Sequence, residues 1–238
     1  MDNAIVRKSS ENNRIIIAVL LMVYLAGVLI KGLANGIYAS EYMNFLSLDL
    51  SGGSATDFLF DNFYLLSLSL HCLSLMLVIE AVLINSKTLF LPLSLMLFAV
   101  FDLVDKNAMA IQIVMSHPDS RTNFTGLSML FNVVLQFIST LGILSLAVYA
   151  FIHIFSPSGG AAQLTRRFWF LPAVLCAMSL LMGVAATVYS YAAVMATIEL
   201  NVFGVALQLL LNTVIPKLFM SLILLLTGKW IVERDMGR

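Results

Sequence analysis

Residues 201–226 read NVFGVALQLLLNTVIPKLFMSLILLL, and this stretch decides what kind of fold the chain adopts. A helix of that length rises about 39 Å, which is enough to cross a hydrocarbon core about 30 Å thick. Its interior nevertheless holds Gln208, Asn212, Pro216 and Lys217. A lysine inside an apolar span is costly, and it usually faces protein, water or a counter-ion rather than lipid. We therefore expect the rest of the chain to provide a polar environment for Lys217.

The composition is that of an integral membrane protein. Of 238 residues, 61% are hydrophobic and 11% are charged, whereas soluble domains are about 25% charged. The formal net charge is zero, so nothing in the charge balance favours binding to nucleic acid, and the lipid bilayer is the expected partner. Cys72 and Cys176 both fall inside apolar runs and form neither a disulfide framework nor a zinc pattern. No cofactor is expected.

The apolar runs predict an all-α fold, a polytopic membrane helix bundle forming one integral membrane domain with about six transmembrane helices. A basic start before the first run also resembles a cleavable signal peptide, but a retained helix is favoured because further spans follow. The reversal between the fifth and sixth spans has a poor turn signal. Residues 108–115 are expected to lie on the membrane surface. The predicted spans are approximately 15–34, 63–84, 88–104, 124–155, 168–196 and 202–226.

The distribution of Lys and Arg predicts the orientation. Nine of the 13 fall in the terminal segments, the turn at Lys87 and the segment with Arg166 and Arg167, and three fall in the other connections, with Lys217 excluded as intramembrane. The positive-inside rule therefore places both termini in the cytoplasm of a multi-pass cell-membrane protein. Each half has one helix, a longer connection and two helices joined by a tight turn, which indicates 3+3 inverted halves.

Counting depth along the predicted helices suggests a partner for Lys217. Glu80 lies 17 residues past Phe63, and Lys217 lies 15 residues past Val202, in spans predicted to run in the same direction. The two charges should therefore sit at similar depth and form an ion pair or a proton- or substrate-linked pair. Pro216 supports a special site, because it removes a backbone N–H and loosens the helix beside Lys217. The alternative is that both side chains snorkel to the cytoplasmic headgroups.

Polar side chains also form stripes in three of the predicted spans. Such stripes are commonly hydrogen bonds between helices. Alternatively, they line a cavity that binds a small polar solute together with Glu80 and Lys217. The stripe residues that would bind the solute are Asn132 and Gln136 in the fourth span, Tyr191 in the fifth, and Gln208 and Asn212 in the sixth.

Asp102 and Asp105 lie one turn apart at the predicted outer end of the third span. We expect them to be solvated end-caps, although carboxylates there would also attract a cation. Their DxxD spacing is similar to that of prenyl-transferring membrane enzymes, in which carboxylates hold magnesium on a diphosphate. The second acidic motif of those enzymes is absent from the sequence.

Two histidines also fall inside predicted spans. His71 and His153 should lie in opposite leaflets, so a single haem held between them is not expected. We predict that His71 is a hydrogen-bonded core histidine, with Ser67 and Ser74 on the same helical face.

The leading functional hypothesis is a small-solute carrier or a membrane-embedded solute-binding subunit. In size and six-helix plan the chain resembles the substrate-binding subunits of vitamin uptake systems. One alternative is a non-transporting membrane assembly, immunity or regulatory protein that works with a partner membrane subunit. A second is a membrane enzyme that uses Asp102 and Asp105, but the HExxH, GxSxG and Walker motifs are absent, so enzyme activity is not expected.

Overall fold

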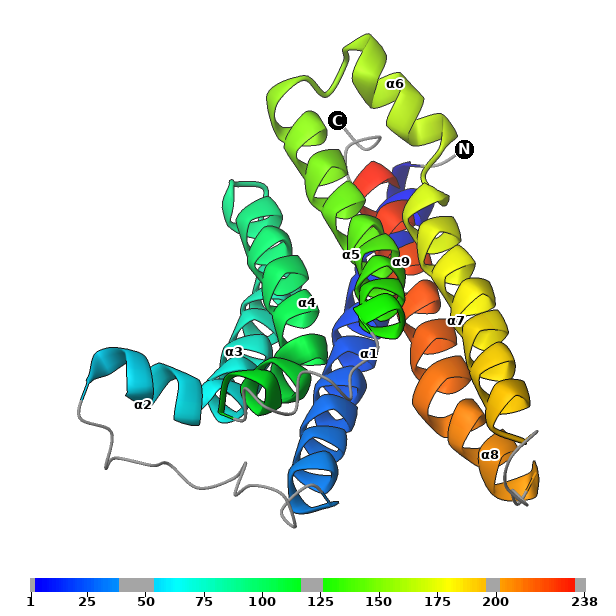
Figure 1. Ribbon diagram of the computed structural model, residues 1–238. Coiled ribbons are helices and arrows are strands. Elements are labelled where there is room, and N and C mark those ends of the chain that lie inside the picture. The colour runs from blue at the N-terminus through cyan, green and yellow to red at the C-terminus, as the bar shows by residue number, and fades with distance from the viewer. Residues whose placement is uncertain (1–2, 39–53, 117–125, 196–201, 234–238) are drawn as a thin grey trace. The chain divides into compact units, whose positions relative to one another are not determined.

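Helices account for the secondary structure of the computed structural model, which describes residues 3–38, 54–116, 126–195 and 202–233; none of these residues is in a strand. The predicted all-α class is therefore confirmed. The helices, labelled in Figure 1, are α1 (Asn3–Tyr38), α2 (Ala55–Asp61), α3 (Phe63–Leu83), α4 (Phe90–Ser116), α5 (Gly126–Phe155), α6 (Gly160–Arg167), α7 (Leu171–Met195), α8 (Val202–Leu209), the π-helical turn η3 (Leu210–Val214) and α9 (Ile215–Glu233).

Several of these helices are long and apolar enough to cross a membrane. Four qualify within the described residues: Glu11–Ile37 in α1, Phe63–Leu83, Gln136–Phe155 in α5, and Ile215–Glu233. A fifth is obtained when Gly160–Arg167 and Leu171–Ala185 are joined across their bend of 48°. The chain is thus a multi-pass membrane protein.

Helix α4 is long enough to cross but carries too much charge to qualify on composition. Its 27 residues would rise about 40 Å. Asp102 lies within it, and Asp105 and Lys106 follow one helical turn later. Where these three charges are placed therefore decides whether α4 can lie in a bilayer.

The described helices group into two units, which are treated separately below. The N-terminal unit comprises residues 14–133, with most of α1 and all of α2, α3 and α4. The C-terminal unit comprises residues 134–238 together with residues 1–13. It holds most of α5, the short helix α6, and α7 through α9.

Helices α3 and α4 form an antiparallel hairpin in the N-terminal unit (Figure 1). Asn85 adopts a positive φ of 52°, which asparagine tolerates better than most residues. The N–H of Asn85 donates to Val82 O and that of Ser86 to Ala81 O, the Schellman arrangement that ends many helices. The tight turn predicted at residues 85–87 is confirmed.

Helix α4 extends beyond the predicted third span. We expected it to end near Val104, and this expectation is wrong; the expected position of residues 108–115 on the membrane surface stays a prediction. Helix α4 continues to Ser116, with Ala108 and Gln112 buried in the N-terminal unit. The Gln112 side chain bonds to the start of α3, which explains the continuation.

Helices α7 and α9 pack side by side in the C-terminal unit, as Figure 1 shows. Cys176 on α7 lies near Lys217 on α9, and Trp169, just before α7, lies against Gly228 further along α9. Residue numbers therefore increase along α7 in the direction in which they decrease along α9, so the two helices are antiparallel. A Cβ at Gly228 would meet the Trp169 carbonyl oxygen, which shows why a residue without a side chain stands there.

Two predicted features of this unit need qualification. The last predicted span extends beyond Leu226 to Glu233. The reversal before it falls between Met195 and Val202, in residues 196–201, which lie outside the described residues.

Candidate functional site

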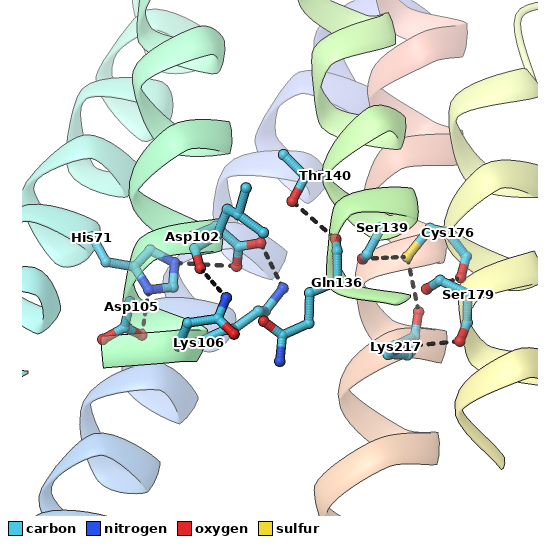
Figure 2. Close-up of polar contacts among 12 residues, drawn as sticks. His71, Asp102, Asp105, Lys106, Gln136, Ser139, Thr140, Cys176, Ser179 and Lys217 are labelled. Carbon is cyan, nitrogen blue, oxygen red and sulfur yellow. Dashed lines mark hydrogen bonds and ion pairs between the residues drawn. The ribbon is translucent and has the colours of Figure 1, made fainter. Parts of the chain in front are cut away.

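Four ionisable side chains meet inside the α3–α4 hairpin and form what we call the His71 cluster: His71, Asp102, Asp105 and Lys106. Figure 2 shows the His71 ring between the two carboxylates. Nδ1 of His71 lies 2.9 Å from Asp105 Oδ2, and Nε2 lies 3.5 Å from Asp102 Oδ1. The ammonium of Lys106 lies 2.5 Å from the other oxygen of Asp102. The His71 side chain is 2% exposed and that of Asp102 is 0% exposed.

The turn explains why these residues meet. His71 precedes Ser86 by 15 residues and Asp102 follows it by 16, so in an antiparallel hairpin they lie at the same level. Asp105 and Lys106 follow Asp102 at i+3 and i+4, which places all three on one face of α4. At about 1.5 Å per residue, the cluster lies about 23 Å from the turn and about 12 Å from the start of α3. The cluster therefore lies well inside α3, a helix long and apolar enough to cross a membrane.

The hydrogen bonding of His71 leaves a place for one further proton. An ionised carboxylate only accepts hydrogen bonds, so Nδ1 carries the hydrogen that is donated to Asp105. In a neutral ring, Nε2 is then an acceptor that faces the acceptor Oδ1 of Asp102. Both atoms are buried, and neither has a hydrogen-bond partner in the described part of the chain. A proton on Nε2 would turn this opposition of two lone pairs into a charge-assisted hydrogen bond.

An aromatic ring also packs against His71. The Phe98 ring stacks on the imidazole with centroids 5.6 Å apart and an interplanar angle of 29°. The face of an aromatic ring carries negative potential and attracts a cation at this distance. Tyr24 of α1 packs edge-on against Phe98, which holds that ring in place.

Lys31 of α1 completes the charges around the cluster. It lies within electrostatic range of Asp102, Asp105 and Lys106. With His71 neutral, the two carboxylates and two ammonium groups balance, and protonation of His71 adds one positive charge. The side chains of Asp105 and Lys106 are 15% and 31% exposed, so the cluster reaches the surface of the unit on that side.

Beyond the cluster, Gln112 joins the two helices a second time. Its Oε1 accepts the backbone N–H of Tyr64 at 2.8 Å, and its Nε2 donates to Asp61 O at 2.6 Å. These bonds satisfy a free donor at the start of α3. The Tyr64 hydroxyl donates to Gly32 O of α1 at 2.7 Å. The hairpin is therefore fixed at both ends, by the Asn85 turn and by Gln112, with the His71 cluster between them.

Lys217 lies near the middle of a helix that runs without interruption from Val202 to Glu233 in the C-terminal unit. Its ammonium donates to the backbone oxygen of Ser179 on α7 at 2.9 Å. The wide turn η3 lies just before it, where the N–H of Ile215 donates to Leu210 O, five residues back. A proline cannot continue the ordinary helical hydrogen bonds, so the wide turn accommodates Pro216. The predicted loosening of the backbone beside Lys217 is present.

Close packing around Lys217 depends on small and polar residues. Gly183 leaves room for the ammonium, because a Cβ there would lie 3.3 Å from Nζ. The Cys176 thiol lies 3.7 Å from Lys217 O and 3.7 Å from the Ser139 hydroxyl of α5 (Figure 2). These contacts link α5, α7 and α9 at one level of the C-terminal unit.

The predicted solute-binding residues are only partly described by the structure. Glu80 is exposed on α3, in the N-terminal unit, whereas Lys217 belongs to the C-terminal unit, so their pairing stays a prediction. Gln136 is half-buried on α5. The backbones of the remaining four are helical, but their side chains lie outside what the structure describes: Asn132, Tyr191, Gln208 and Asn212.

Two expectations about the outer end of α4 meet different outcomes. The solvated end-cap prediction for Asp102 and Asp105 is wrong, because Asp102 is buried against Lys106 and both carboxylates face His71. The core-histidine prediction is confirmed by the bond to Asp105. The Ser67 and Ser74 hydroxyls donate to backbone oxygens of their own helix, including His71 O.

Metal binding and similarity to known proteins give no further assignment. Among the residues that the structure describes, no three His, Cys, Asp or Glu side chains are grouped so as to hold a metal ion. Comparisons with protein-family models, with curated proteins and with solved structures found no match to this chain.

Proposed function

We propose that this chain is a small-solute carrier of a cell membrane, with movement of the solute linked to proton binding at His71. The observation that carries the proposal is the pair of buried atoms, His71 Nε2 and Asp102 Oδ1, which face each other at 3.5 Å without a hydrogen-bond partner among the described residues. Ionisable groups buried at hydrocarbon depth are expensive, and they mark proton relays and solute pathways in many membrane proteins.

The chemistry needed from His71 is reversible protonation, which histidine performs more readily than other side chains. Uptake of a proton at Nε2 would draw Asp102 toward the ring and weaken its hold on Lys106. The charged groups that face His71 are Asp102 and Asp105 of α4. Lys106 of α4 pairs with Asp102, and Lys31 of α1 lies within electrostatic range of both carboxylates. Tyr64 and Cys72 of α3 lie near Asp105. Protonation would thus alter contacts among α1, α3 and α4, and motion of these helices could open a solute path.

The proposal includes six crossing helices: α1, α3, α4, α5, α7 and the continuous helix α8–α9. Counting α4 is supported by the mutual neutralisation of its three charges with His71 and Lys31. Three long helices in each unit are what 3+3 inverted halves require. The proposed orientation places both termini in the cytoplasm. The solute would be small and polar, bound by Lys217 and the polar stripes of α5, α7 and α8–η3, and a contribution from Glu80 stays a prediction.

The test measures proton binding directly. The full chain is reconstituted in liposomes on a solid-supported membrane, and charge movement is recorded after a pH jump. We expect a transient current in the native protein that His71→Gln abolishes. Currents evoked by amino acids, sugars, nucleosides and vitamins then identify the solute class, and Lys217→Leu and Glu80→Leu should reduce them. An unchanged pH-jump current in His71→Gln would refute proton binding at this residue.

The alternative, a non-transporting membrane component, is favoured by one observation. Asp102 and Lys106 form an i, i+4 ion pair within a single helix, which can stabilise α4 without any role in transport. In that case no solute would evoke a current, and substitution of His71 would change only the stability of the N-terminal unit. The enzyme hypothesis needs open carboxylates for a metal, whereas Asp102 and Asp105 are engaged by Lys106 and His71.

A further inference from the structure

Helix α6 connects α5 to α7 and is bent away from α7. Helix α5 ends at Phe155 with an apolar span, and α7 begins at Leu171. The 25 residues of α7 would rise about 37 Å, which already exceeds the hydrocarbon thickness. The bend of 48° between α6 and α7 turns α6 away from the direction of α7. We place α6 at the membrane surface where both spans end.

The inner face of α6 is fixed to α5. Ala162 is 0% and Thr165 is 4% exposed. The Thr165 hydroxyl donates to Ala162 O and accepts a hydrogen bond from Nε2 of His153 at 2.9 Å. Just after α6, the Tyr149 hydroxyl donates to Phe168 O at 2.8 Å. These contacts hold α6 and the following residues in a defined position, so its outer face is presented as a fixed surface.

That outer face combines positive charge with exposed apolar side chains. Arg166 and Arg167 end α6. Leu164 is 59%, Phe168 is 38% and Phe170 is 40% exposed. Phe168 and Phe170 follow the end of α6, and Leu164 and Arg167 are one turn apart within it. Basic residues beside exposed apolar ones are typical of segments that lie in the lipid headgroup region.

The arginines are arranged with hydrogen-bonding capacity to spare. Arg166 donates through Nη2 to Pro157 O at 3.1 Å, and its buried Nε has no partner among the described residues. The Arg167 guanidinium lies 5.8 Å from the centroid of the Phe168 ring. A guanidinium held by stacking is well suited to bind a phosphate through two parallel hydrogen bonds.

We propose that Arg166 and Arg167 bind the phosphate headgroup of an anionic phospholipid, with its acyl chains against Leu164, Phe168 and Phe170. The two positive charges favour a ligand with an anionic headgroup. The exposed apolar residues beside the two guanidinium groups favour a ligand that also has acyl chains, rather than a free anion. The proposal does not depend on the transport function or on the His71 cluster, which belongs to the other unit.

Trp169 provides the measurement, because it lies between the two phenylalanines of this site. The full chain in neutral detergent is titrated with phosphatidylglycerol carrying brominated acyl chains, which quench tryptophan fluorescence on contact. Phosphatidylcholine with the same chains is the comparison. We expect half-maximal quenching at a concentration at least fivefold lower for phosphatidylglycerol, and this preference should shrink as salt is raised.

Variants separate the site from general charge. Arg166→Gln with Arg167→Gln should reduce the preference for phosphatidylglycerol to about one, Arg167→Gln alone should reduce it in part, and Arg167→Lys should retain some of it. Lys87→Gln removes an exposed charge from the α3–α4 turn and should leave the preference unchanged. Continued protection of the buried Cys176 thiol shows that each variant is folded.

Three results would overturn the proposal. Equal quenching of the native protein by the two lipids would show that the protein does not distinguish the charge of the headgroup. A preference that persists in the folded double variant would place the lipid elsewhere. Displacement of the lipid by millimolar glycerol phosphate would show that the arginines bind a free phosphate and that the apolar residues contribute nothing.

Discussion

Removal of Lys106 tests whether the His71 cluster is organised as the structure describes. The Asp102 side chain is 0% exposed and the Lys106 side chain is 31% exposed. Lys106→Met therefore leaves a fully buried carboxylate without its closest cation, and breaking a buried pair in this way costs about 3–5 kcal/mol. Asp102→Asn leaves an ammonium that already reaches the surface, so we expect a smaller cost of about 1–3 kcal/mol. The inequality follows from the difference in burial.

The double variant gives the energy of the pair itself. With Asn at 102 and Met at 106, no charge of the pair remains to be left uncompensated. The combined cost should therefore fall short of the sum of the single costs by about 1–3 kcal/mol. Lys87→Met, an exposed lysine in the turn of the same hairpin, is the matched control and should change stability by less than about 0.5 kcal/mol.

The assay must report on the N-terminal unit. Both tryptophans, Trp169 and Trp230, lie in the C-terminal unit, so intrinsic fluorescence does not do so. The cysteines are better placed, because Cys72 is in α3 and Cys176 is in α7. Maleimide labelling during a denaturant titration, resolved by peptide mass spectrometry, gives one unfolding curve for each unit. The substitutions should shift the Cys72 curve more than the Cys176 curve.

Two outcomes would refute this account of the cluster. If Asp102→Asn destabilised the protein more than Lys106→Met, the burial difference would not control the energetics. If the double variant lost the full sum of the single costs, the two side chains would not interact.

The remaining predictions concern packing and backbone satisfaction, and the same labelling assay measures each. Gly142→Ala should destabilise the C-terminal unit by about 1–3 kcal/mol, because the new Cβ would lie 2.7 Å from Pro172 O; Gly27→Ala, with nothing within 4 Å, should be neutral or stabilising. Gln112→Ala should cost the N-terminal unit about 1–3 kcal/mol, because it removes the side-chain bonds to the Tyr64 N–H and Asp61 O; an unshifted Cys72 curve would contradict this. Gly183→Val should displace the Lys217 ammonium from Ser179 O and shift the Cys176 curve, whereas Gly183→Ala should have a smaller effect, since its Cβ would lie 3.3 Å from Nζ.

Much of the helical plan could be predicted because it depends on local sequence. The α3 bounds follow from an apolar run, and the reversal after it follows from an asparagine that accepts a positive φ. The extension of α4 past Val104 could not be predicted in this way. It depends on Gln112, whose side chain bonds to the start of α3, 48 residues earlier in the sequence.

The environment of Lys217 could also not be predicted by searching the sequence for charged partners. Its acceptor is the backbone oxygen of Ser179, and every residue carries such an oxygen, so no residue type marks the position. The signal that exists is indirect: Gly183 on α7 leaves space for the ammonium. Pro216 does mark the wide helical turn, because the missing N–H is a property of that residue alone.

The His71 cluster could have been found by counting from the turn instead of from the ends of each span. Depth measured from span ends put Asp102 and Asp105 at the surface, although His71 lies at the level of Asp102 once the hairpin turns at Ser86. Hydropathy is averaged over one helix at a time. The average for α4 therefore counts its charged residues in full and ignores the charged or polar partners that α3 and α1 provide. A charged helix can lie in a bilayer when its charges face such partners rather than lipid. If α4 crosses the membrane as proposed, making both His71 and Lys31 apolar should disturb the insertion of α4 before that of any other helix, which glycosylation tags placed on either side of it would detect.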